Sequence, residues 1–173
     1  MRGILSHRMN ILIRKATVND ARQVADVMNS VIAEGKHTIF DRPFSEEDET
    51  KFISSLGSRS ALHVAEIDGK ITGVQSIDLL TDLATSVQHV GTMGTWLLLD
   101  YRGLGIGRSL AGESFRFARS HGYRKILIQV LADNHRALRF YRSLGFCDVG
   151  IAKQHVQLGG VFYDEVYLEK CLL

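Results

Sequence analysis

A glycine-rich segment, residues 102–108, carries the residues best suited to bind a ligand. Its three glycines alternate with other residues between two arginines (RGLGIGR). Glycine has no Cβ to hold a ligand away from the backbone, and a helix predicted to begin here presents unpaired amides and the positive end of its dipole. Because guanidinium groups bind phosphate oxygens, the segment predicts a site for a phosphate-bearing ligand.

Two common phosphate-loop patterns are absent from this segment. A Walker A loop needs GxxxxGK followed by Ser or Thr, which the chain lacks. A dinucleotide-binding loop needs GxGxxG, but Arg108 or Leu110 stands where each register requires the third glycine. The structural alternative is a glycine-rich turn that only reverses the chain direction and binds no ligand, although such a turn does not need two flanking arginines. We therefore expect another kind of phosphate site.

Positive charge is concentrated around this segment. The chain has 173 residues and a formal net charge of +2, yet residues 102–142 contain nine Lys or Arg against two acidic residues. The remainder carries 12 basic and 17 acidic residues. The whole-chain balance argues against a dedicated nucleic-acid-binding protein, and no known motif supports one. We expect a local site for an anionic partner and no nucleic acid.

Length and composition predict one globular domain. The chain is 45% hydrophobic and has a single proline and no internal repeat, so we expect one domain over residues 11–173, with residues 1–10 as a possible disordered leader. No apolar run reaches the 18 residues of a membrane span, so we expect no membrane partner. Cys147 and Cys171 lack the spacing of a metal site or disulfide framework. We expect no metal and a cytoplasmic location.

Apolar periodicity predicts the elements that position the loop. Strands are expected at residues 11–15, 62–67, 70–77, 88–99, 126–131, 149–158 and 161–170. Helices are expected after the capping residues Thr17 and Ser45, at residues 105–121 and at residues 134–144. The helices that follow the fourth and fifth strands require a partly parallel, mixed α/β sheet.

Three segments together resemble the GCN5-related N-acetyltransferase (GNAT) family. RGLGIG matches the family signature (Gln/Arg)xxGx(Gly/Ala), and residues 95–101 are similar to the family's fourth strand. A second family motif is matched by Asn134, Tyr141 and the Gly145-Phe146 pair. The resemblance implies a single-domain α/β fold, with a mixed, largely antiparallel sheet of about seven strands and four helices, splayed between the fourth and fifth strands.

The resemblance also implies acetyl-CoA as co-substrate, bound in the wedge between those two strands, without a metal. The loop amides would take the pyrophosphate, and the end of the fourth strand would pair with the pantetheine. Tyr141 would protonate the departing thiolate, whereas helical periodicity alone would make it a core aromatic. The implied cofactor-binding residues are Leu97, Leu98, Leu99, Arg102, Gly103, Leu104, Gly105, Ile106, Gly107, Arg108 and Asn134.

Acetyl transfer also needs a proton acceptor, because simple amines are charged at neutral pH. Family members often carry a glutamate on the fourth strand, but residues 88–99 contain no carboxylate. Glu34 is the first candidate, since its segment resembles a wall of the family's acceptor pocket, where its carboxylate would be free to receive a cationic amine. A solvated glutamate at a helix end is the alternative. His89 is the second candidate, although a lone histidine on a strand is more often a structural group than a base, and a water chain is the third.

The implied function is transfer of an acetyl group from acetyl-CoA to a primary amine of a small molecule, such as an amino acid or a polyamine, by direct attack in a ternary complex. Residues 159–166 are similar to the last hairpin of a small-amine and amino-acid acetyltransferase subgroup. The alternatives are a protein N-terminal or lysine acetyltransferase and a non-catalytic CoA-binding sensor. A homodimer is compatible with the family, although the sequence identifies no interface.

Overall fold

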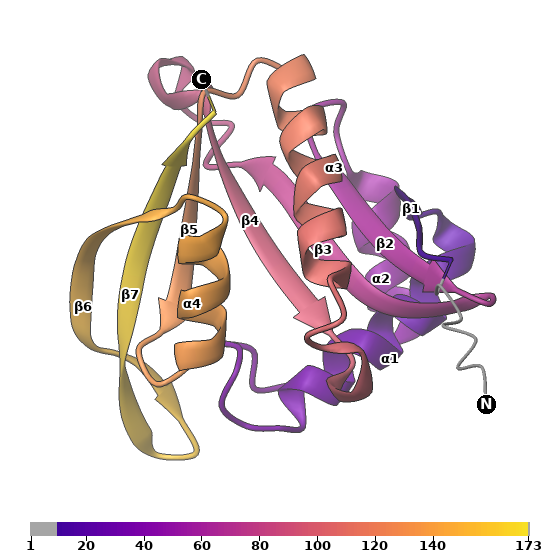
Figure 1. The fold of residues 1–173 in the computed structure, drawn as a ribbon, viewed down its shortest axis with the longest axis horizontal. Helices are drawn as coiled ribbons and strands as arrows, with labels where there is room; N and C mark the ends of the chain where they lie inside the picture. The colour runs from indigo at the N-terminus through magenta and orange to yellow at the C-terminus, as the bar shows by residue number, and fades with distance from the viewer. Residues whose placement is uncertain (1–9, 173) are drawn as a thin grey trace, which may run out of the picture.

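The computed structural model describes residues 10–172 as a single sheet with helices on both faces (Figure 1). The strands are β1 (Leu12–Lys15), β2 (Ala61–Ile67), β3 (Lys70–Leu79), β4 (Val90–Leu97), β5 (Lys125–Leu131), β6 (Cys147–Leu158) and β7 (Val161–Cys171). The helices are α1 (Ala21–Ile32), α2 (Glu46–Ser55), α3 (Ile106–Ser120) and α4 (His135–Ser143), with 3₁₀ turns at Val18–Asp20, Thr85–Val87 and Leu99–Tyr101. The predicted order of elements is confirmed.

The seven strands form a mixed sheet, as predicted, and their order in the sheet is β1-β2-β3-β4-β5-β7-β6. Neighbouring strands are antiparallel, except that β4 and β5 run parallel. The pairing of β4 with β5 extends only from Val90 to Thr92 on β4. Beyond Thr92 the two strands diverge into the V seen between them in Figure 1. The sheet is therefore splayed where the sequence predicted it to be.

Local sequence determines how several of these elements begin and end. Asp68 and Gly69 take positive φ angles of 50° and 77° in the turn between β2 and β3, as a tight hairpin requires. At the start of α2, Ser45 Oγ accepts from the Asp48 amide at 3.1 Å, and Asp48 Oδ2 accepts from the Ser45 amide at 2.9 Å. This reciprocal cap satisfies two donors at the helix terminus.

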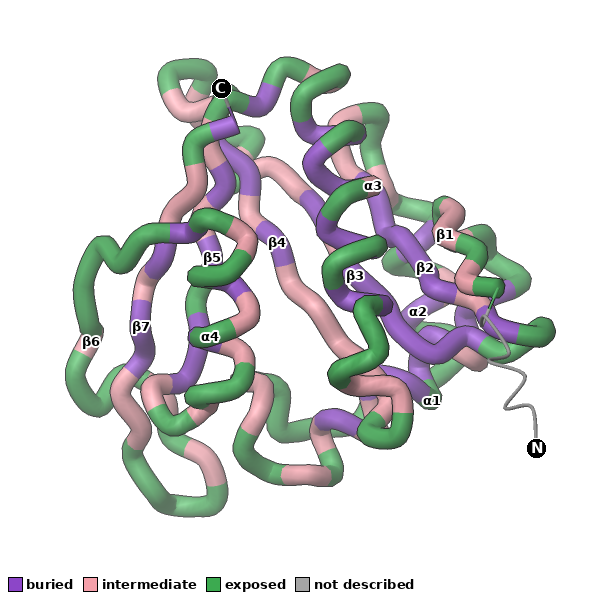
Figure 2. The backbone as a smooth tube through the Cα atoms, viewed as in Figure 1, coloured by how far each residue is buried: buried purple, intermediate pink, exposed green. Residues whose placement is uncertain are grey.

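The helices bury their apolar faces on opposite sides of the sheet. On α1, the apolar residues Val24, Val27, Met28 and Val31 form a buried row, and most of it packs with α2 against β2 and β3. On the other face, α3 and α4 contribute to a core that also includes residues of β4, β5 and β7. Figure 2 shows β2 and β3 largely buried, β4 intermediate over much of its length and β6 exposed along most of its length. The site described below lies at the end of the sheet where β4 and β5 diverge, between helices of the two layers.

Two predicted boundaries differ from the structure or lie outside it. The strand predicted at residues 88–99 is shorter, because the Leu98 amide bonds to Thr72 O and the chain then turns into the 3₁₀ segment Leu99–Tyr101. Most of the possible leader, residues 1–9, lies outside the described residues. Within residues 10–172, no helix has both the length and the apolar character needed to cross a membrane.

Candidate active site

The loop between β4 and α3 presents a row of free backbone amides. Gly103 and Gly105 adopt φ angles of 84° and 86°, which are strained for residues with a side chain. After Arg102, the next amide with a backbone acceptor is that of Ser109, which donates to Gly105 O at 3.1 Å. Within the described chain, the amides of residues 103–108 therefore have no protein acceptor. Free amides at a helix N-terminus have the geometry expected of an anion cradle.

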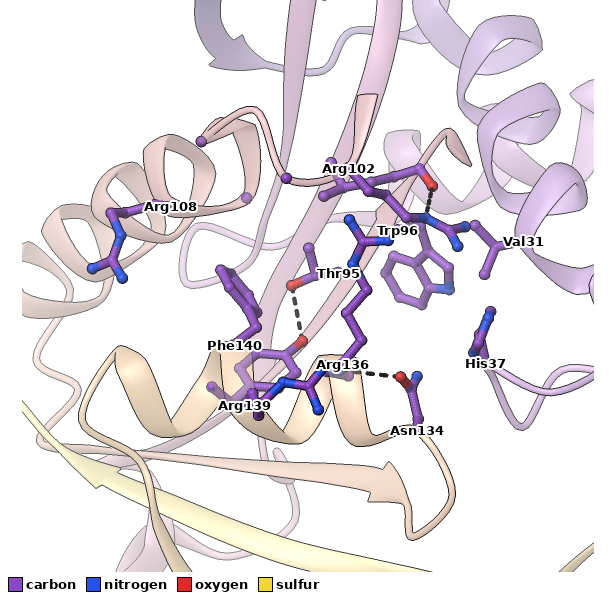
Figure 3. Close-up of a pocket in the computed structure, with 16 residues that line it drawn as sticks. Val31, His37, Thr95, Trp96, Arg102, Arg108, Asn134, Arg136, Arg139 and Phe140 are labelled. Atoms are coloured by element: carbon purple, nitrogen blue, oxygen red, sulfur yellow. Dashed lines mark hydrogen bonds between the residues drawn. The ribbon is translucent and has the colours of Figure 1, made fainter. Parts of the chain in front are cut away.

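A cavity of about 440 Å³ opens beside this loop, between β4 and α4 (Figure 3). Side chains from α1, β4, the loop and α4 surround it. Its lining residues are Val31, His37, Thr95, Trp96, Leu97, Arg102, Gly103, Gly105, Gly107, Arg108, Asn134, Arg136, Ala137, Arg139, Phe140 and Tyr141. The cavity thus occupies the open part of the β4–β5 wedge.

The structure gathers most of the predicted site residues around this cavity, but not all of them. Those that line it are Leu97, Arg102, Gly103, Gly105, Gly107, Arg108, Asn134 and Tyr141. Those that do not are Leu98, Leu99, Leu104, Ile106, Glu34 and His89. Ile106 is fully buried below the loop, and Leu99 and Leu104 are exposed. His89 precedes β4 at the end opposite Leu97, about 25 Å away by strand rise.

Arg102 is held by an ion pair rather than left free for an anion. Its Nε donates to Leu97 O at 2.9 Å, and its Nη1 and Nη2 donate to the two carboxylate oxygens of Glu34. The Arg102 guanidinium lowers the pKa of the Glu34 carboxyl, so Glu34 is a weaker base than an ordinary glutamate. The expectation that this carboxylate is free to receive a cationic amine is therefore wrong.

His37 lies next to this ion pair and lines the cavity. Its Nε2 is 3.2 Å from Glu34 Oε2. Its Nδ1 is buried and has no hydrogen-bond partner among the described residues. Burial lowers the pKa of the imidazole, so the ring is neutral at pH 7. A neutral imidazole with an unpartnered nitrogen has the properties of a proton acceptor.

Tyr141 is buried on α4 and reaches across the wedge to β4. Its Oη donates to Thr95 Oγ1 at 2.9 Å, a bond drawn in Figure 3, and Gln75 Nε2 donates to the same Thr95 oxygen at 2.8 Å. Burial raises the pKa of the Tyr141 phenol to about 12. The phenol therefore remains protonated throughout the neutral range and has a proton to donate.

Asn134 and three arginines, Arg108 at the start of α3 and Arg136 and Arg139 on α4, complete the cavity. Asn134 caps α4 by accepting from the Ala137 amide through Oδ1 at 3.1 Å, which leaves its Nδ2 protons available. Within residues 10–172, no carboxylate forms an ion pair with Arg108, Arg136 or Arg139. These three side chains leave uncompensated positive charge at the rim, which favours a ligand with several phosphate charges.

Sequence reasoning did not identify several lining residues. Thr95 could have been found from strand alternation, because it shares a face of β4 with Leu97. His37 lies in the segment expected to form a pocket wall, but its burial depends on tertiary packing. Trp96 lines the cavity and packs against Phe40 of the segment between α1 and α2, with the two ring centroids 6.1 Å apart. No local pattern marks that aromatic contact.

Comparisons with known proteins identify similar sequences and folds. The profile of the Acetyltransferase (GNAT) family matches residues 29–146. An N-alpha-acetyltransferase of Sulfurisphaera tokodaii is 25% identical over 163 residues, which cover 90% of this chain and 89% of that protein.

Solved structures share the fold over nearly the whole chain. A phosphinothricin acetyltransferase from Sinorhizobium meliloti in complex with AcCoA has a TM-score of 0.87 at 21% identity, covering 94% of this chain and 89% of that one. A ribosomal-protein-alanine N-acetyltransferase from Brucella melitensis has a TM-score of 0.85 at 24% identity, covering 92% and 99% of the respective chains. At these identities the likeness is one of fold.

Proposed function

The chain belongs to the acetyltransferase (GNAT) family and is an acetyl-CoA-dependent N-acetyltransferase, and from that premise we propose that it acetylates the primary amine of a small molecule. The observation that carries the proposal is the cavity in the β4–β5 wedge. One end of that cavity is the cradle of free amides, and its walls carry both a proton donor, Tyr141, and a proton acceptor, His37.

The cavity residues fit the diphosphate and the pantetheine arm of acetyl-CoA. The loop amides and the rim arginines Arg108, Arg136 and Arg139 supply donors and charge for phosphates. Glycine at residue 107 lets the helix lie close to the cavity wall, because a Cβ there would lie 3.1 Å from Phe140 Cζ and 3.4 Å from Leu97 Cδ1. The Asn134 amide would donate to the pantetheine arm. When bound, acetyl-CoA supplies an acetyl group activated as a thioester.

Chain geometry also supports an oxyanion site on β4. The Leu98 amide bonds to β3 through Thr72 O, so strand alternation directs the amides of Thr95 and Leu97 away from β3 and into the wedge. An amide held in this way stabilises negative charge on a carbonyl oxygen without any special side chain.

We assign the amine proton to His37 and the leaving-group proton to Tyr141. The His37 imidazole accepts the proton at Nδ1, reached by the amine or by a water because that atom is buried, and the Glu34 carboxylate 3.2 Å from its Nε2 stabilises the resulting charge. Glu34, first considered as the base, is assigned mainly to holding Arg102, because both of its oxygens are bonded there. Tyr141 gives up the proton on its Oη.

The part of the cavity that would receive the amine substrate favours an amine with an apolar or aromatic group over a polyamine. Val31 and Trp96 line it, and no aspartate or glutamate of the described residues does. A polycation would find no carboxylate partner there, since Glu34 is neutralised by Arg102. Within the class expected from the sequence, amino acids and related small amines are therefore preferred.

A second candidate function is acetylation of a protein N-terminus. It is favoured by the N-alpha-acetyltransferase of Sulfurisphaera tokodaii, whose similarity extends along most of both chains. A thiol-release assay on a panel of amino acids, other amines, polyamines and peptides distinguishes the two. Turnover of peptides alone would favour the second function. Tight binding of acetyl-CoA without turnover of any amine would indicate a CoA-binding sensor.

Cofactor binding is tested separately by thermal unfolding. Acetyl-CoA is expected to raise the melting temperature of the native protein, because it binds only the folded state. Gly105→Asp is expected to abolish this rise, since it places a side chain and a negative charge at a left-handed position in the cradle. Gly112→Asp is the matched control, because Gly112 lies exposed on the same helix with open space around it. No rise for the native protein at saturating acetyl-CoA would refute the proposal.

A further inference from the structure

A row of polar side chains crosses the sheet and ends at Tyr141. His63 on β2 is the register partner of Gln75 on β3, and Gln75 is the register partner of Thr95 on β4. Register partners on neighbouring strands lie on the same face of a sheet. Two helices bond to the ends of this row. His63 Nδ1 is 2.9 Å from Ser114 Oγ of α3, and Thr95 Oγ1 is 2.9 Å from Tyr141 Oη of α4.

Two polar atoms inside this row lack partners. Gln75 is 0% and His63 is 1% exposed, and within the described residues neither Gln75 Oε1 nor His63 Nε2 has a hydrogen-bond partner. Leaving buried polar atoms unsatisfied costs stability, and an apolar side chain of the same size would avoid that cost. The glutamine at this position therefore requires an explanation other than packing.

The two unpartnered atoms are chemically complementary. Burial lowers the pKa of His63 to about 4, so its ring is neutral at pH 7. When Nδ1 accepts from the Ser114 hydroxyl, the ring proton lies on Nε2, which makes that atom a donor. His63 and Gln75 are register partners, and a donor on that side of Gln75 favours the amide orientation in which the Gln75 amide nitrogen bonds Thr95, which is the bond that the structure has.

We propose that Gln75 and Thr95 are positioning residues that orient the Tyr141 hydroxyl so that its proton points to the leaving sulfur. This inference rests on the proposed function, in which Tyr141 is the proton donor. Gln75 Nε2 always donates to Thr95 Oγ1, which leaves the Thr95 hydroxyl proton for Tyr141. In the structure Tyr141 Oη donates to Thr95 Oγ1 at 2.9 Å. If both hydroxyl groups rotate, donor and acceptor exchange: Thr95 Oγ1 donates to Tyr141 Oη, and the Tyr141 proton is free to reach the sulfur.

The chain of hydrogen bonds from Gln75 through Thr95 to Tyr141, called the relay below, stabilises the charge that appears on Tyr141 during proton transfer. The carbon–sulfur bond breaks with its electron pair on sulfur, and the Tyr141 Oη–H proton passes to that sulfur. The O–H electron pair stays on Oη, where the hydrogen bond from Thr95 stabilises the phenolate. Thr95 keeps its own proton, and the phenolate regains one from water. Burial raises the pKa of the Tyr141 phenol, and the hydrogen bond with Thr95 acts in the opposite direction, so loss of Thr95 would make the phenol a poorer acid.

A double-mutant cycle tests the relay. Tyr141→Phe is expected to lower kcat by about 100-fold, within the usual range for loss of a general acid. Gln75→Met, which keeps the side-chain volume, is expected to lower kcat by roughly 5- to 10-fold, and Thr95→Val by more, because their effect passes through Tyr141. In the Tyr141→Phe background, neither change should lower kcat further. Thr95→Ser should retain activity. Thr92→Val, the same exchange elsewhere on β4, is the matched control.

A measurement without acetyl-CoA gives an independent readout. The ¹³Cζ resonance of Tyr141, assigned by its loss in Tyr141→Phe, should shift in Gln75→Met although Gln75 bonds to Thr95 and not to Tyr141. It should not shift in Thr92→Val. An unmoved resonance, or losses of kcat by Gln75→Met that are equal with and without the Tyr141 hydroxyl, would overturn the relay. A native protein that releases no thiol with any amine would instead overturn the proposed function.

Discussion

Glu34 and Arg102, 68 residues apart in the sequence, are joined by two hydrogen bonds that tie the segment after α1 to the loop before α3. Arg102 also donates to Leu97 O, so the same guanidinium holds the end of β4. The pair neutralises Arg102, and the positive charge available to a phosphate ligand comes from Arg108, Arg136 and Arg139, which also line the cavity. One residue pair thus connects the acceptor wall with the cofactor loop.

Glu34→Gln is expected to destabilise the fold. The Arg102 side chain is only 12% exposed, so removal of the carboxylate leaves a largely buried charge without its partner. We expect a loss of about 1–3 kcal/mol in the free energy of unfolding, measured in urea, which lies between exposed and fully buried pairs. Glu47→Gln, which breaks the exposed pair with Lys51, is the control and should cost less than about 1 kcal/mol. Equal losses would show that the Glu34 pair has no special structural role.

The pH dependence of the rate distinguishes His37 from Glu34 as the base. When kcat/KM is calculated from the concentration of unprotonated amine and plotted against pH, it should fall as the pH decreases through the His37 pKa. Burial places that pKa below its ordinary value of 6.5. His37→Gln should remove this acid limb and most of the rate. Because the Glu34 carboxylate raises the His37 pKa, Glu34→Gln should move the limb to lower pH. Loss of the limb in Glu34→Gln, with His37→Gln unaffected, would identify Glu34 as the base instead.

The loop and the fold could be predicted because their signals are local. The glycines at 103 and 105 occur where positive φ is required, and the apolar periodicity of α1 and α3 matches their buried faces. The partners of Glu34 could not be predicted, since its contact with Arg102 depends on how the end of α1 packs against β4. The same holds for Gln75, whose significance arises from its register with Thr95. Tertiary contacts of this kind have no sequence period.

Gly107→Ala is expected to weaken acetyl-CoA binding. The added Cβ would lie 3.1 Å from Phe140 Cζ, so the ring must move within the cavity that it lines. If the displaced ring costs the complex about 1–3 kcal/mol of binding free energy, the Kd measured by calorimetry rises by roughly 5- to 150-fold. Gly112→Ala on the same helix is the control. It has open space around its Cβ, should stabilise the fold by about 0.5–1 kcal/mol and should leave Kd unchanged.

Glu49→Gln is expected to stabilise the protein above neutral pH. Glu49 is 3% exposed on α2, its Oε2 has no partner among the described residues, and burial raises its pKa to about 7 from an ordinary value of 4.5. Because the unfolded chain releases this proton first, the free energy of unfolding falls as the pH rises from 4.5 to 7, by at most about 3 kcal/mol. In urea unfolding, the free energy of unfolding of Glu49→Gln should therefore be about 1–2 kcal/mol higher than that of the native protein at pH 8 and nearly the same at pH 4.5. The exposed control Glu46→Gln should show no such gain, and a Glu49→Gln advantage that is equal at both pH values would contradict a buried, titrating carboxyl.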